Sequence, residues 1–352
     1  MPRLLVLEFI VLAALWGSSF LFMRIGSAEL GAWPTAGLRV GLAAVFLLPT
    51  FAVAGVWADF RRHAKPILFV GLLNSGIPFA MFAFAVMHIS TGLTAILNAT
   101  VPLWGAVIAW AWLRDKPSGS RWLGLAIGFV GVCLLVLGKS GSNASGQLLG
   151  SLNPMSLLAM GACLLAALCY GISASFTRRY LDGVKPLAIT TGSQIGAALG
   201  LAVPTLLLWP SEPISGAAWA AMGAVAILGT ALAFMIFFHI IDQVGPSKAM
   251  TVTFMIPVFG LIYGAIFLGE VITPWMVGCG AVILTGTALS TGLVSWPRRR
   301  SAPKTPKPRP LPPRCGGPGR GPCVFLGSSR HDPSHFCLAA AIRGRPRAAD
   351  RA

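Results

Sequence analysis

The chain has 352 residues, of which 55% are hydrophobic and only 11% charged, and its mean hydropathy is +0.76. Soluble globular proteins carry about 25% charged residues, so this composition excludes a protein whose whole surface faces water. The net charge of +17 does not indicate a nucleic-acid-binding protein, because 13 of the 27 Lys and Arg residues lie in residues 297–352 and the remainder form no basic stripe interleaved with aromatic residues.

Ten apolar runs follow one another along the first 295 residues, each close to the roughly 20 residues that a helix needs to cross a bilayer. The first run is too long for the core of a signal peptide and no A-x-A cleavage site follows it, so we expect it to be retained. We predict an all-α membrane protein with ten transmembrane helices in the lipid bilayer. In chain order they cover residues 5–25, 34–57, 66–87, 91–113, 121–138, 154–178, 186–209, 215–241, 247–268 and 273–295.

The charged residues of the predicted loops indicate the orientation of these helices, because cytoplasmic loops are rich in Lys and Arg. If the chain crosses the membrane ten times, Arg24 and Lys139 are the only Lys or Arg residues of the predicted loops on one side of the membrane. The other side carries Arg3, Arg61, Arg62, Lys65, Arg114, Lys116, Arg121, Arg178, Arg179, Lys185 and Lys248. This asymmetry predicts a multi-pass protein of the inner (plasma) membrane with both termini in the cytoplasm.

The two halves of the membrane part resemble each other at an offset of 154–155 residues. In the first span of each half, Trp16-Gly17-x-Ser19-x-x-Phe22-x-Arg24 matches Tyr170-Gly171-x-Ser173-x-x-Phe176-x-Arg178. In the fourth, Pro102, Gly105, Leu113 and Asp115 match Pro257, Gly260, Leu268 and Glu270. Because each half has five spans, the second copy is expected to cross the membrane in the opposite sense. Inverted repeats of this kind are typical of transporters, which open a central site to each side in turn.

Several short motifs resemble the EamA family of the drug/metabolite transporter superfamily. They are Trp16-Gly17-Ser18-Ser19-Phe20, Leu38-Arg39, Thr100-x-Pro102, and Pro257 followed by Leu268-Gly269-Glu270. The resemblance covers roughly residues 5–293 and implies carriers of small metabolites, including amino acids and related compounds, or of drugs. The chain departs from the family pattern at Arg114-Asp115, where the first half often has a Gly-Glu pair.

The repeat and the resemblance together predict the domain organisation. Residues 1–138 form a first EamA-like five-helix repeat, 139–153 an inter-repeat loop and 154–296 a second five-helix repeat. Residues 297–352 are basic and rich in Pro and Gly with few large apolar residues, so we expect a disordered cytoplasmic tail.

Polar and aromatic side chains near the middle of the spans are candidates for a substrate cavity, because polar groups in lipid are costly without a partner. Hydrogen bonding between helices explains any single Ser or Thr equally well. The resemblance places the cavity among the third, fourth, eighth and ninth spans. The candidates are Trp16, Asn74, Ser75, Asn98, Thr100, Tyr170, Thr230, Thr253 and Tyr263.

Pro102 and Pro257 interrupt the fourth and ninth spans at equivalent positions. Proline removes a backbone donor and clashes with the preceding turn. We interpret the two prolines as helix hinges beside the cavity, with ordinary kinks as the alternative.

Two ionisable residues inside spans have possible charge or proton roles. Arg39 could bind a substrate carboxylate, extend to the membrane interface or brace the fold. His239 could relay protons, with the proton as a possible coupling ion, or be structural.

No cofactor or metal site is expected, since the chain has no C-x-x-C, no H-E-x-x-H and no Walker loop. A small-molecule substrate is the expected partner, and the oligomeric state stays open. The expected function is secondary transport by alternating access, as an exporter and not an enzyme. The alternatives are a channel and a membrane-embedded enzyme such as an intramembrane hydrolase using Gly171-x-Ser173 and His239.

Overall fold

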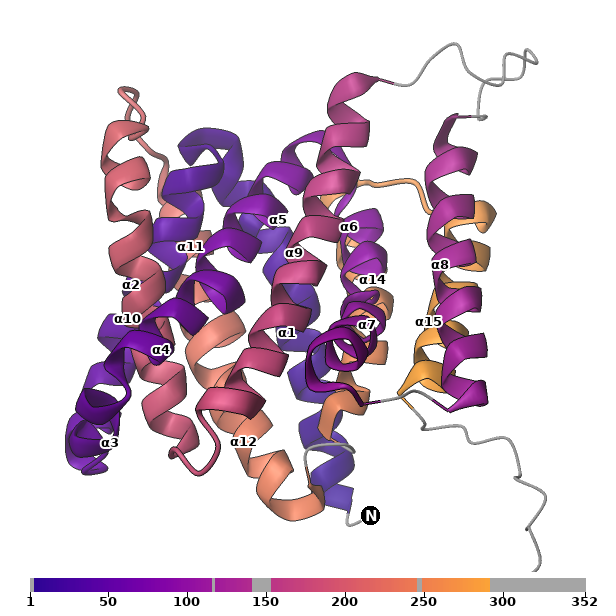
Figure 1. Ribbon diagram of the computed structural model, residues 1–352. Coiled ribbons are helices and arrows are strands. Elements are labelled where there is room, and N and C mark those ends of the chain that lie inside the picture. The colour runs from indigo at the N-terminus through magenta and orange to yellow at the C-terminus, as the bar shows by residue number, and fades with distance from the viewer. Residues whose placement is uncertain (1–2, 116–117, 141–152, 246–248, 292–352) are drawn as a thin grey trace, which may run out of the picture. The chain divides into compact units, whose positions relative to one another are not determined.

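The computed structural model describes residues 3–115, 118–140, 153–245 and 249–291, which form helices and connecting turns without a strand (Figure 1). The predicted tail, 297–352, and nearly all of the predicted loop, 139–153, lie outside these residues. Within them, the prediction of an all-helical protein is confirmed.

The first half contains α1 to α8. A glycine with φ of +76°, Gly31, separates the first two helices, and the Ser90 side chain caps the sixth by accepting a hydrogen bond from the backbone N–H of Leu93. The elements are α1 (Arg3–Leu30), α2 (Ala32–Val53), α3 (Trp57–Arg62), α4 (Ala64–Gly71), the π-helical turn η1 (Leu72–Gly76), α5 (Ile77–His88), α6 (Thr91–Asn98), α7 (Val101–Leu113) and α8 (Gly119–Ser140).

The second half has a similar order of elements, with no counterpart of α3 among the described residues and the 3₁₀ turn η3 in the place of α6. A π-helical turn again interrupts the third span, and a residue with positive φ again ends the fourth, Gly269 at +62° where the first half has Arg114 at +56°. The elements are α9 (Pro154–Tyr180), α10 (Pro186–Leu207), α11 (Gly216–Ala226), the π-helical turn η2 (Ile227–Leu232), α12 (Ala233–Val244), the 3₁₀ turn η3 (Met250–Phe254), α14 (Ile256–Leu268) and α15 (Pro274–Ser290).

Nine helical stretches among the described residues are long and apolar enough to cross a membrane. They agree with the first nine predicted spans. The predicted tenth span, 273–295, extends beyond the described residues, and α15 within it is a shorter apolar helix of 17 residues.

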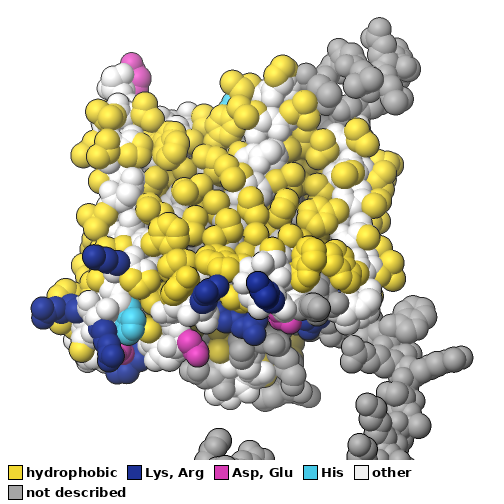
Figure 2. Space-filling model, in the orientation of Figure 1, with side chains coloured by type: hydrophobic (Ala, Val, Ile, Leu, Met, Phe, Trp, Pro, Cys, Tyr) yellow, Lys and Arg dark blue, Asp and Glu magenta, His cyan; other side chains and the backbone are white. Residues whose placement is uncertain are grey.

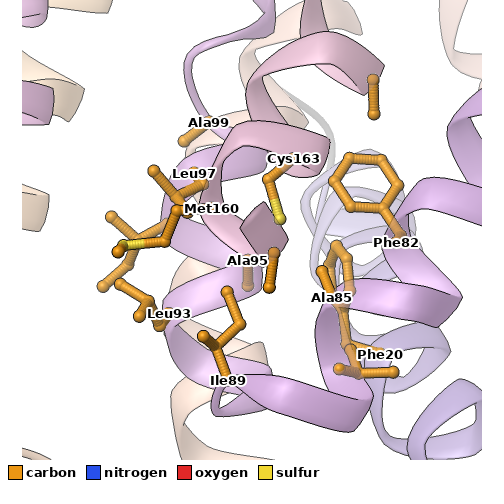
Figure 3. Packing of buried hydrophobic residues seen from close by; sticks show 14 of the residues in the cluster. Phe20, Phe82, Ala85, Ile89, Leu93, Ala95, Leu97, Ala99, Met160 and Cys163 are labelled. Atoms are coloured by element: carbon orange, nitrogen blue, oxygen red, sulfur yellow. The ribbon is translucent and has the colours of Figure 1, made fainter. Parts of the chain in front are cut away.

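The helices pack in corresponding pairs. Helix α2 lies along α10 and α8 lies along α15, while α1 packs on α11 and α14 and α9 packs on α5 and α7 (Figure 1). The largest buried cluster joins α1, α5, α6 and α9, and Figure 3 shows Phe20, Phe82, Leu93 and Cys163 within it. This cluster positions the helices that surround the central pocket.

The surface is apolar around the middle of the bundle and charged at its edge. Large hydrophobic side chains such as Val53 and Leu207 are 90% and 79% exposed, as suits contact with lipid. Figure 2 shows the hydrophobic band, with Lys and Arg side chains gathered along its lower edge, near α3. We call this edge the basic end of the bundle and the other the opposite end.

Candidate functional site

A pocket of about 210 Å³ lies in the centre of the bundle between helices of both halves. A single water needs roughly 10–15 Å³ on this measure, so the pocket has room for a small organic molecule. Its lining residues are Trp16, Ser19, Phe20, Met23, Arg39, Asn74, Phe79, Phe82, Asn98, Val101, Tyr170, Gly229, Phe234, Thr253 and Ile256.

Five of the nine predicted cavity residues line this pocket: Trp16, Asn74, Asn98, Tyr170 and Thr253. Asn74 lies in η1 and Asn98 ends α6, so both amides occupy places where regular α-helix is interrupted. Arg39, predicted for a charge role, also lines the pocket.

The other four candidates contact protein instead of lining the pocket. Ser75 Oγ accepts a hydrogen bond from Gln194 Nε2 at 3.0 Å, and Thr100 Oγ1 donates to the Leu97 carbonyl at 2.7 Å. Thr230 Oγ1, in η2, donates to the Val225 carbonyl of α11 at 3.0 Å, and the Tyr263 ring packs against two phenylalanines of α14. Their side chains therefore act within and between helices.

Sequence reasoning missed nine of the lining residues, and four of these are phenylalanines. Phe20, Phe79, Phe82 and Phe234 line the pocket, and nothing in an apolar span distinguishes such residues from core residues. The repeat does carry a signal for two of them, because Phe79 and Phe234 are 155 residues apart (234 − 79).

Residues at equivalent positions of the two halves line the pocket together. The separations are 155 residues in four pairs and 154 in the pair from α1 and α9 (170 − 16). The pairs are Trp16 and Tyr170, Asn74 and Gly229, Phe79 and Phe234, Asn98 and Thr253, and Val101 and Ile256. The pocket is therefore built from the same positions in each half.

Arg39 is a buried cation at the wall of the pocket, with only 5% of its surface exposed. Its Nε donates to Thr230 Oγ1 at 3.0 Å, and its Nη1 contacts Met23 Sδ at 3.2 Å. The guanidinium carbon lies 3.7 Å from the centre of the Phe79 ring, a cation–π contact. The predicted alternative that Arg39 extends to the membrane interface is wrong, because the side chain points into the protein.

A second cavity, which we call the vestibule, leads from the pocket toward the basic end. It shares Asn74 and Phe234 with the pocket and reaches Thr177 near the end of α9 and Pro186 at the start of α10. Its remaining lining residues are Val70, Ser173, Ala174, Ile189, Thr190, Ser193 and Phe238. The vestibule therefore adjoins the pocket on the side of the basic end.

Packed side chains occupy the bundle between the pocket and its opposite end. Phe20 and Phe82 meet edge to face at 5.7 Å, and Ala85, Ile89 and Leu93 continue the buried cluster toward the start of α6 (Figure 3). These side chains are at most 5% exposed. Two residues, Asn74 and Phe234, line both the pocket and the vestibule.

Glu270 fastens α14 to α6 at this opposite end. Its carboxylate accepts hydrogen bonds from the backbone N–H and the hydroxyl of Thr91, each at 2.8 Å, and from the N–H of Gly92 at 3.4 Å. A carboxylate at a helix N-terminus satisfies unpaired donors and interacts favourably with the helix dipole. We call this arrangement the Glu270 clasp.

Pro102 and Pro257 lie at the first turns of α7 and α14, directly after helix breaks. Proline suits this position, where its missing N–H would have no helical acceptor. The fourth span thus consists of two short helices, α6 and α7, and the ninth of η3 and α14. Each break lies beside a pocket residue, Asn98 or Thr253.

His239 and Ser173, the residues of the hydrolase alternative, have different partners. The exposed His239 has its Nδ1 3.1 Å from a Glu8 carboxylate oxygen, at hydrogen-bond distance, whereas Ser173 Oγ donates to Asn74 Oδ1 at 3.5 Å. The described residues also contain no group of three or more His, Cys, Asp or Glu that could hold a metal ion.

Comparison with known proteins agrees with this architecture. The model of the EamA-like transporter family matches residues 4–137 and 157–292. The uncharacterized transporter YoaV of Bacillus subtilis is 23% identical over 292 residues, 81% of this chain and 96% of that protein. The uncharacterized inner membrane transporter YedA of Escherichia coli K12 is 25% identical over 296 residues, 81% of this chain and 90% of that protein.

One protein of known crystal structure has the same fold, with a TM-score of 0.58 and 18% sequence identity over 83% of this chain and 98% of that one. The family match covers most of the chain in two successive segments, which confirms the resemblance read from its short motifs. The chain is a multi-pass membrane protein that belongs to the EamA-like transporter family.

Proposed function

We propose that the protein is a secondary transporter of the inner membrane that moves a small metabolite, such as an amino acid or a related compound, or a drug by alternating access. The observation that carries this proposal is the central pocket lined by equivalent residues of both halves. In a carrier built from inverted repeats, each half can adopt the conformation of the other, which exchanges the open and closed ends of the site. Ten spans in two inverted repeats, 1–138 and 154–296, with both termini in the cytoplasm, are part of the proposal.

The packing of the helices supports this scheme. The contact of α1 with α14 corresponds to that of α9 with α7, and the contact of α1 with α12 corresponds to that of α9 with α5, as expected for repeats related by a twofold axis. The open vestibule and the closed opposite end correspond to a carrier facing the cytoplasm, if the basic end is cytoplasmic. Loading from the cytoplasm suits an exporter.

Substrate-accelerated counterflow in proteoliposomes tests the proposal. A carrier preloaded with an unlabelled substrate accumulates the labelled compound transiently, because each return of the site brings labelled molecules inward. A channel equilibrates the label without this overshoot, and an enzyme converts it. Absence of the overshoot for every compound that crosses the membrane through this protein contradicts alternating access.

The hinge role of the two prolines gives a further prediction. Pro102→Ala and Pro257→Ala allow the broken spans to straighten, so we expect each to slow transport at least about fivefold, which corresponds to about 1 kcal/mol in the barrier. Insertion and thermal stability should change little, because each proline lies at a helix start. The rate of counterflow measures the effect.

Pro204→Ala is the matched control, since Pro204 lies inside α10 and lines neither cavity. If Pro102→Ala and Pro257→Ala both show the counterflow rate of the wild-type protein, the prolines do not act as hinges.

A further inference from the structure

The Arg39 guanidinium carries a charge without a counter-ion in the described structure. No described carboxylate lies within 4 Å of the Arg39 guanidinium, because the described salt bridges are formed by other residues. Removing a charge from water costs several kcal/mol unless an opposite charge or a full set of hydrogen bonds compensates. A cation that is 95% buried and unpaired at a pocket wall therefore favours occupation of the pocket by an anion.

The contacts of Arg39 leave donors for such an anion. An arginine has five N–H donors, and described residues accept two of them, one at Thr230 and one at the weakly accepting sulfur of Met23. Phe79 holds the face of the guanidinium, and Thr230 fixes Nε. The planar fork is thus oriented, and paired N–H groups of this kind match the two oxygens of a carboxylate.

The rest of the pocket suits an uncharged body. Aromatic rings from four helices form its walls, among them Trp16, Phe82, Tyr170 and Phe234, and the amides of Asn74 and Asn98 add neutral hydrogen-bonding groups. No described acidic residue lines the pocket to repel an anion. A molecule with one carboxylate and an aromatic or aliphatic body matches these surfaces.

The route to the pocket also carries positive charge. Arg178 and Arg179 end α9 and Lys185 precedes α10, beside the vestibule residues Thr177 and Pro186. Arg178 is paired with Asp115 at 3.6 Å and Lys185 with Asp59 at 4.0 Å, whereas Arg179 stacks on a tyrosine ring without a described acidic partner. Asp182 lies in the same turn, so the excess of positive charge at the basic end comes from Arg61, Arg62, Lys65 and Arg114. An excess of positive charge near a cleft attracts anions.

We propose that the transported substrate is a small organic carboxylate whose carboxyl group binds Arg39 and whose aromatic or aliphatic body lies between the aromatic rings of the pocket. This inference rests on the proposed transport function and specifies its substrate class.

Matched pairs of ligands that differ only at the carboxyl group test the proposal. The probes are benzoate, 3-phenylpropanoate, indole-3-acetate, L-phenylalanine and hexanoate, each beside its primary amide, and binding to the purified full-length protein is measured by ligand-induced thermal stabilisation. We expect at least one acid to bind the wild-type protein about tenfold or more tightly than its amide, as for a charge-assisted hydrogen-bonded pair. Equal binding of acids and amides, or binding of no acid in the panel, overturns the proposal.

Variants assign the preference to Arg39. Arg39→Gln should abolish the difference between acid and amide, and Arg39→Lys should retain part of it, because Lys keeps the charge and loses the fork. Arg121→Gln removes the same charge from α8, which contributes no residue to the pocket, and should keep the full preference. A preference for acids over amides that survives in Arg39→Gln overturns the proposal. If that variant does not fold, the comparison of acids with amides on the wild-type protein still tests the carboxylate substrate.

Counterflow with the same compounds separates this inference from the proposed function. If neutral amides accelerate counterflow and Arg39→Gln does not change this, the protein is a carrier, but the proposal of a carboxylate substrate is contradicted. Arg39-dependent binding of acids without any trans-acceleration supports the binding site and contradicts transport.

Discussion

Replacing Glu270 by alanine should open the end of the pocket that is closed in this structure. The carboxylate accepts three hydrogen bonds at the start of α6, so its loss leaves donors of Thr91 and Gly92 without partners. Hydrogen bonds to a charged group contribute about 1.5–3 kcal/mol. If the conformation that is closed at the opposite end loses about 2–3 kcal/mol of stabilisation, its equilibrium with the open conformation shifts by about 30- to 150-fold.

A single cysteine in the pocket measures this shift. In a chain whose seven native cysteines are replaced, Asn98→Cys reports on the pocket. We expect a membrane-impermeant thiol reagent applied at the opposite end to label it at least about 30-fold faster in the Glu270→Ala background. Glu212→Ala removes an exposed carboxylate between α10 and α11 and should leave the rate unchanged. Equal rates in the Glu270→Ala and parent proteins contradict a role of the clasp in closure.

Adding a side chain at either of two equivalent glycines, Gly17 and Gly171, should destabilise the fold. A Cβ on Gly171 would lie 2.9 Å from the backbone carbonyl carbon of Trp104, and one on Gly17 would lie 2.5 Å from the Cβ of Phe259. Neither neighbour can rotate away, since one is backbone and the other is the first side-chain atom. We expect Gly171→Val and Gly17→Val each to lower the free energy of unfolding by about 1–3 kcal/mol or more.

Thermal unfolding in detergent measures the loss. Gly161→Val in the same helix α9 is the control, because nothing lies within 4 Å of a Cβ there. Gly161→Val makes the same change in helix propensity at a position without close neighbours. A surface substitution of this kind changes the free energy of unfolding by about 0.5 kcal/mol or less. Equal stability of the Gly171 and Gly161 variants contradicts close packing of α9 on α7.

The sequence predicts the spans well because lipid imposes one strong rule, that each backbone polar group pairs within its own helix. Nine described stretches follow it, and the breaks beside Pro102 and Pro257 follow from the missing proline N–H. The π-helical turns η1 and η2 carry a weaker signal, because their polar residues Asn74, Ser75 and Thr230 suggest a cavity or a hydrogen bond between helices and not a π-helical backbone.

The pocket is less predictable because its residues depend on partners far away in the chain. Ser75 bonds Gln194, 119 residues away, and Arg39 bonds Thr230, 191 residues away, so hydrophobicity and spacing do not reveal which polar groups are already paired. The Glu270 clasp likewise joins residues 179 positions apart. The repeat provides the missing signal in part, as the equivalence of Phe79 and Phe234 illustrates.

Distances between spin labels at the two ends of the bundle test alternating access most directly. One pair of labels, at Tyr180 of α9 and Gln243 of α12, spans the basic end, and both side chains are exposed. A second pair, at Met87 of α5 and Ile272 after α14, spans the opposite end. Pulsed electron paramagnetic resonance gives the distance distribution of each pair in the parent protein and with Glu270→Ala.

Removal of the clasp should change the two distances in opposite directions: the distance at the opposite end lengthens and the distance at the basic end shortens. Lengthening of both distances together, which leaves a path open from end to end, would contradict a carrier.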